Sequence, residues 1–82
     1  MTVQTFRELL AKQPFQPFRI TMSSGFSYDV THPELAALTK TDLLIGIGDI
    51  DDLVPEAFKY CSLLHITAID PITKKKKLKP SL

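Results

Sequence analysis

The chain has 82 residues, enough for one domain with a modest core and too few for two. Hydrophobic residues make up 44% of it, which argues against a disordered chain, and no apolar stretch approaches the roughly 18–20 residues of a membrane-spanning helix. The net charge of +1 is unevenly spread, because residues 74–82 hold five lysines and no acid, whereas the rest holds five basic and nine acidic residues. The start lacks the pattern of a signal peptide and Cys61 has no second cysteine to pair with, so we expect a cytoplasmic protein.

The first predicted element is a short amphipathic helix. Thr2 or Thr5 can cap its start, and Phe6 and Leu10 fall on one apolar stripe. Pro14 ends the helix, because the residue before a proline is disfavoured in helical backbone angles. A helix this short is marginal alone in water, so its stripe must pack against other elements.

A β-hairpin follows the helix. Residues 18–22 and 26–30 both alternate apolar and polar positions, and Gly25 suits the turn between them. The aromatic residues of this hairpin, Phe26 among them, are expected to share an apolar face that the helix covers.

Further short strands are predicted downstream. Residues 43–48 form a continuous apolar run, which is typical of a strand covered on both faces or placed at an interface. Residues 58–61 and 65–69 read as the last two strands, joined by a tight turn, and Phe58 is expected in the core.

One helix and five or six strands in meander order predict an α+β domain over residues 1–73. In it the N-terminal helix packs on a small, strongly bent antiparallel sheet or on a Sm/SH3-like β-barrel. Residues 74–82 are expected to form a basic, disordered tail.

Two resemblances rest on particular segments. The pattern QPFxPFRI at residues 13–20 and HPE at residues 32–34 resembles a family of small, uncharacterised bacterial proteins, over about residues 2–71. This resemblance implies a bacterial protein and carries no activity. More weakly, residues 60–71 are similar to the last two strands of the Sm-like fold, which includes the bacterial RNA chaperone Hfq, and this implies a barrel topology. The Tyr-Lys-His step that contacts RNA in Hfq is replaced here by Tyr60-Cys61-Ser62.

Candidate chemical groups are few. Three aspartates, with Glu56 nearby, could hold a hard cation, but their spacing lacks the glycine and distal glutamate of a calcium loop, and a solvated acidic turn is favoured. These aspartates are Asp49, Asp51 and Asp52. Cys61 and His65 could form a thiolate–imidazole pair, although a buried packing cysteine is the commoner outcome.

His32 and Glu34, with Asp29, could serve acid–base chemistry if they lined one pocket, but a turn histidine with a local hydrogen bond is favoured. With no specific catalytic or cofactor motif in the sequence, we expect a protein that is not an enzyme and binds no cofactor or metal.

The sequence favours a protein-interaction or self-associating module, with the chain itself or another protein as partner. Its expected association strand contains Leu43, Leu44, Ile45 and Ile47. The alternative is an Sm-like RNA-binding protein whose basic tail contacts polyanions. The lysines of that tail are Lys74, Lys75, Lys76, Lys77 and Lys79.

Overall fold

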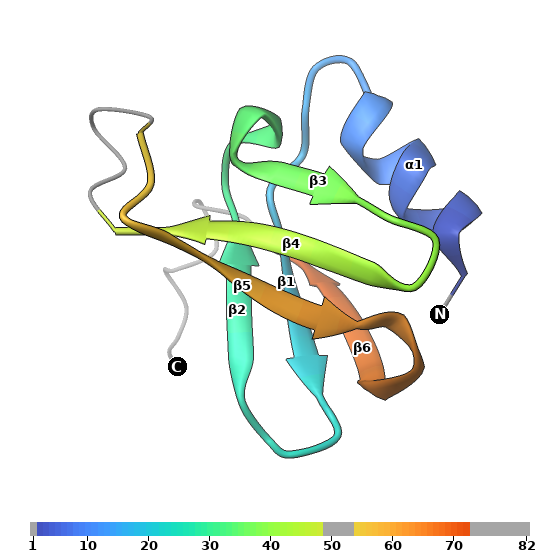
Figure 1. The fold of residues 1–82 in the computed structure, drawn as a ribbon. Helices are drawn as coiled ribbons and strands as arrows, with labels where there is room; N and C mark the ends of the chain where they lie inside the picture. Colours follow the sequence, from blue (N-terminus) through green and yellow to red (C-terminus); the bar gives the residue numbers. More distant parts are fainter. Residues whose placement is uncertain (1, 49–53, 73–82) are drawn as a thin grey trace, which may run out of the picture.

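A computed structural model describes residues 2–48 and 54–72, and in these the chain is a small α+β protein with one N-terminal helix and two three-stranded antiparallel sheets (Figure 1). The elements are α1 (Val3–Ala11), β1 (Phe18–Met22), β2 (Ser27–Val30), η1 (Pro33–Leu35), β3 (Ala36–Leu38), β4 (Asp42–Ile47), β5 (Ala57–Ser62), η3 (Leu63–His65) and β6 (Ile66–Pro71), where η marks a 3₁₀ turn.

The predicted helix is confirmed, and Thr2 rather than Thr5 is its N-cap. The Thr2 hydroxyl oxygen accepts a hydrogen bond from the backbone N–H of Thr5 at 3.3 Å, which satisfies one of the free donors of the first turn. The helix ends at Ala11, and Lys12 is already extended, so the helix stops before Pro14 as predicted, one residue earlier than the restriction on Gln13 alone requires.

The predicted hairpin is also confirmed. β1 pairs antiparallel with β2, and Ile20 lies opposite Tyr28. Gly25 has φ of 99° in the turn, a backbone angle that favours glycine. Phe26 lies in this turn and is 66% exposed, so the prediction that the helix covers it is wrong.

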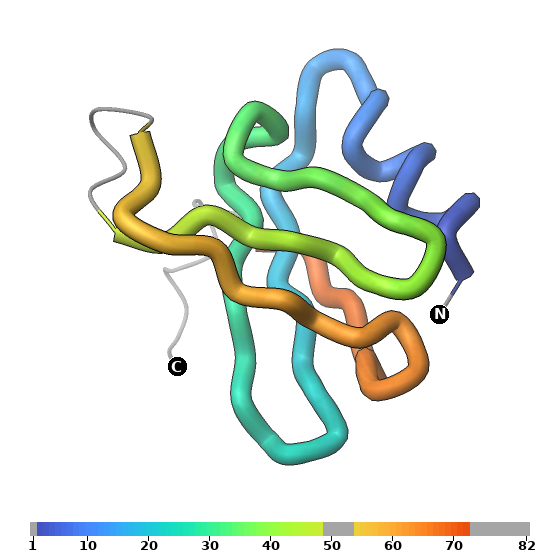
Figure 2. Tube along the Cα trace, in the orientation of Figure 1, coloured from blue at the N-terminus to red at the C-terminus, as the bar shows by residue number. Residues whose placement is uncertain are grey.

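The strands do not follow the expected meander. The first sheet has the order β2-β1-β6 and the second has the order β3-β4-β5. The last strand therefore leaves its sequence neighbour β5 and pairs with β1, where Ile20 lies opposite Ile69. The turn η3 carries the chain from one sheet to the other (Figure 2). The described strands thus form two separate sheets and no closed barrel.

One core joins the helix and both sheets. Phe6 of α1 is fully buried, and its ring centre lies 6.1 Å from that of Phe18 in β1. Ile20 from the first sheet and Leu43 and Cys61 from the second are almost fully buried in the same cluster. Burying apolar side chains from all three layers is the main stabilising contribution in so small a domain.

Candidate functional site

The clearest unpartnered feature of the described chain is the outer edge of β5. This strand ends the order β3-β4-β5, and no described strand pairs with its other side. Two large side chains stand on it, Phe58 at 45% exposure and Tyr60 at 72%. We call Phe58 and Tyr60 the aromatic edge. Phe58 was expected in the core, and its exposure corrects that prediction.

The backbone of β5 presents hydrogen-bonding groups outward at alternate residues. The N–H of Leu63 donates to the carbonyl of Thr41 at 2.9 Å, and in the same register Cys61 lies opposite Leu43. Because hydrogen-bonded and non-hydrogen-bonded pairs alternate along an antiparallel ladder, the odd-numbered residues of β5 bond to β4. The N–H and C=O groups of Phe58, Tyr60 and Ser62 therefore point away from the sheet.

The side chains of β5 divide between two faces. Lys59 lies opposite Ile45 on the side of the core, whereas Phe58 and Tyr60 lie opposite Gly46 and Leu44 on the outward face. Leu44 is half-buried there, so apolar surface continues from the aromatic edge onto β4.

Gly46 lets the segment before β5 pack closely on this outward face. A Cβ atom added at Gly46 would lie 2.9 Å from the Cβ of Pro55, closer than side chains tolerate. Packing thus explains why a glycine stands in the apolar run, since it leaves room for the Pro55 ring beside the aromatic edge.

The residues of the expected association strand lie in β4, which is the central strand of its sheet and not an edge. β4 is paired on both sides, with β3 and with β5, and Leu43 and Ile45 are buried in the core. Leu44 and Ile47 keep part of their side chains exposed. Of the two edge strands of this sheet, β3 and β5, the one that carries large exposed apolar side chains is β5.

The cysteine–histidine pair is not assembled. Cys61 is 1% exposed, and burial raises the pKa of its thiol, while Lys59 acts to lower it and Asp42 to raise it. His65 is exposed and lies instead beside the β1–β2 turn, where its Nδ1 is 3.4 Å from the Ser23 hydroxyl oxygen. A buried neutral thiol packs as a small apolar group and is a poor nucleophile.

Two of the other acid–base candidates, Asp29 and His32, contact nearby side chains. Asp29 accepts a 2.7 Å hydrogen bond from the Nε of Arg19 across the β1–β2 pair, which raises the pKa of the Arg19 guanidinium. The Nδ1 of His32 lies 3.1 Å from the Thr31 hydroxyl oxygen, which is the local contact favoured for a turn histidine. Glu34 is exposed on η1.

Several expected sites lie outside the described residues. These are the three aspartates at 49, 51 and 52 and all five lysines of the basic tail. Within residues 2–48 and 54–72, no group of three or more histidine, cysteine, aspartate or glutamate side chains is placed to hold a metal ion. No helix in the same residues is long and apolar enough to cross a membrane. A comparison of the chain with protein-family models, with curated proteins and with solved structures finds no significant match.

Proposed function

We propose that the protein associates with a second copy of itself by antiparallel pairing of the two β5 strands, which would join their sheets into one. The observation that carries this proposal is the outer edge of β5, which pairs with no strand of residues 2–48 and 54–72 and exposes its aromatic residues. An edge strand offers a row of free N–H and C=O groups, and exposed apolar side chains beside that row favour covering it.

The two-fold symmetry of such a pair limits the register. Two copies related by an axis through the sheet must place one residue of β5 opposite its own copy. The residues inside β5 whose side chains are exposed, and that can therefore meet their own copy, are Phe58, Lys59 and Tyr60, whereas Cys61 is buried in the core.

Charge and strand length favour Tyr60. A pair centred on Lys59 would bring two ammonium groups face to face, which is destabilising for like charges directly opposite. A pair centred on Phe58 would leave only residues 57–59 of each strand opposite one another. A pair centred on Tyr60 keeps residues 58–62 opposite one another and places Lys59 opposite Cys61 of the second copy.

This register also covers the aromatic edge. Tyr60 meets Tyr60 of the second copy, and each Phe58 lies opposite Ser62 of the second copy on the same outward face. Cross-strand pairs that include aromatic side chains each contribute about 0.2–1 kcal/mol, in addition to the backbone hydrogen bonds that the even-numbered residues would form.

Light scattering of the full chain tests the proposal. The wild-type protein is expected to be a dimer, and Tyr60→Pro is expected to be a folded monomer, since proline removes an N–H that points away from β4 and is tolerated on edge strands. Phe26→Ser is the matched control, because it removes an equally exposed aromatic residue from the β1–β2 turn and should leave the dimer intact. A wild-type monomer, or a Tyr60→Pro dimer, would contradict the proposal.

The second candidate is an Sm-like protein, with its two sheets as an open barrel, that binds RNA through the basic tail. The concentration of five lysines in residues 74–82 favours it. Salt-sensitive RNA binding that disappears when residues 74–82 are deleted would support this candidate over the first.

A further inference from the structure

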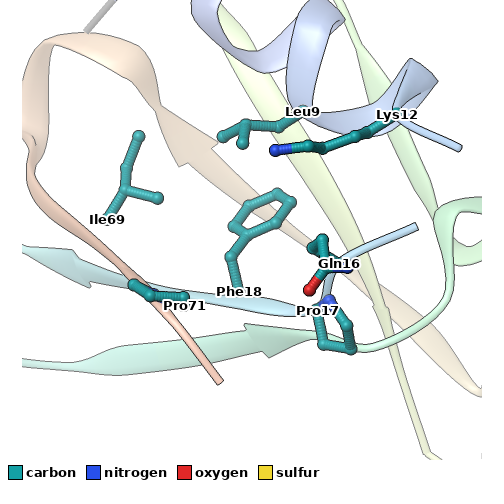
Figure 3. A pocket seen from close by; sticks show the side chains of 7 residues that line it. All are labelled: Leu9, Lys12, Gln16, Pro17, Phe18, Ile69 and Pro71. Atoms are coloured by element: carbon teal, nitrogen blue, oxygen red, sulfur yellow. The ribbon is translucent and has the colours of Figure 1, made fainter. Parts of the chain in front are cut away.

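A cavity lies beside the C-terminal end of α1, and no residue of β5 lines it. This cavity, of about 400 Å³, is lined by residues of the α1 region and of the first sheet. Figure 3 shows Leu9 and Lys12 above it and the start of β1 and the end of β6 below it. The Phe18 ring points into it from β1, and Ile69 closes the opposite side. A volume of this size lies within the range of small-molecule sites in proteins, about 300–1,000 Å³.

The walls of this cavity offer a ligand few hydrogen bonds. Five of its seven lining residues are apolar, and two of these, Pro17 and Pro71, have no backbone N–H to donate. The polar side chains at its border are those of Lys12 and Gln16. A ligand that fits must therefore have a mainly apolar body and little need for polar partners.

The charge at the border comes from Lys12. Its side chain extends along the upper side of the cavity, and its nitrogen lies below Leu9 (Figure 3). The salt bridge found among the described residues joins Arg19 and Asp29 and does not involve Lys12. Lys12 is also the C-cap residue of α1, where the helix dipole leaves partial negative charge that disfavours an anion. The attraction of this end for a carboxylate therefore comes from the Lys12 ammonium group and not from the helix.

We propose that this cavity binds a small amphipathic carboxylate, with its hydrocarbon body against Leu9, Phe18 and Ile69 and its carboxylate at the ammonium group of Lys12. The apolar walls supply affinity for the body, and the single cation supplies preference for the negative head group. The site uses none of the β5 residues and does not depend on self-association.

Three probes with one shared hydrocarbon body test this proposal: octanoate, octanol and octylamine. NMR titration of the full chain should show saturable shifts at the methyl groups of Leu9 and Ile69. Octanoate is expected to bind up to about fivefold more tightly than octanol, the upper range for an exposed ion pair, and octylamine more weakly than both.

Substitution of Lys12 separates the charge from the cavity. In Lys12→Met the preference for octanoate over octanol is expected to disappear while octanol binding stays, and in Lys12→Glu octylamine should become the tightest of the three. Lys59→Met, which removes an exposed lysine that does not line this cavity, should behave as the wild type. Absence of saturable shifts near Leu9 and Ile69, equal binding of octanoate and octanol to the wild type, or an unchanged preference in Lys12→Met would each overturn the proposal.

Discussion

Cys61 shows how a reactive residue type becomes a structural one in this protein. Its side chain lies opposite Leu43 on the core side of the second sheet and is 1% exposed. Desolvation disfavours the thiolate, which is why the pKa of the thiol is raised. The side chain therefore contributes packing in the folded protein and gains charge readily only after unfolding.

This burial predicts a pH dependence of stability. The folded pKa exceeds that of the unfolded thiol, about 8.5, so the contribution of Cys61 is fully present below that pH and is lost as pH rises toward the folded pKa. The free energy of unfolding of the wild type should thus fall more steeply above about pH 8.5 than that of Cys61→Ala. Urea unfolding at neutral and alkaline pH measures the difference, and equal slopes for the two proteins would count against a buried neutral thiol.

Sequence patterns at single residues predicted some positions and missed others. Phe6 and Phe18 were placed correctly in the core, because each lies on an apolar stripe that has one covered face. Phe26 and Phe58 follow the same alternation yet are exposed. Alternation gives the face of a residue, but whether another element covers that face depends on contacts between segments distant in the sequence.

At the scale of elements, α1 and the β1–β2 hairpin could be predicted because local signals specify them. The Thr2 cap, the proline after the helix and Gly25 in the turn each act within a few residues of their own position. The pairing of β6 with β1 could not be predicted, since both β1 and β5 are antiparallel candidates and the choice lies in long-range packing. The free edge of β5, and with it the proposed site, follows from that unpredicted crossing.

The helix cap provides a test at this scale. Thr2→Ala removes the oxygen that accepts from the Thr5 N–H and is expected to lower the free energy of unfolding by about 1 kcal/mol. Thr5→Ala keeps that N–H and should change stability by less than about 0.5 kcal/mol. Urea unfolding followed by circular dichroism compares the two variants, and equal losses would show that the Thr2 cap has no special role.

On the scale of the whole fold, as residues 2–48 and 54–72 describe it, two sheets and one helix share a single core, and the edge strand β5 exposes aromatic side chains. The first sheet covers its outward face with polar side chains, including the Arg19–Asp29 pair, whereas the second sheet presents Phe58 and Tyr60 outward. This difference between the sheets is the reason to place self-association on β5. The proposed dimer names the residue of β5 that meets its own copy, so single substitutions in β5 can test it.

The most direct test is a disulfide scan of β5 in a Cys61→Ala background. Single cysteines are introduced at positions 58, 59 and 60, all of which are exposed. Because Tyr60 is more exposed than Phe58 (72% against 45%), the reaction of each cysteine with a small thiol reagent is measured as well, and the cross-link yields are compared after correction for it. Two copies of Phe58 or of Tyr60 on the symmetry axis would form a hydrogen-bonded pair with Cα atoms about 5.5 Å apart, and two copies of Lys59 a non-hydrogen-bonded pair about 4.5 Å apart. Both distances are within the range of a disulfide. We predict that Tyr60→Cys gives the highest yield of cross-linked dimer under mild oxidation. A dimer that cross-links best through Lys59→Cys or Phe58→Cys would contradict the register, and equal, low yields from a monomeric protein would contradict self-association through β5.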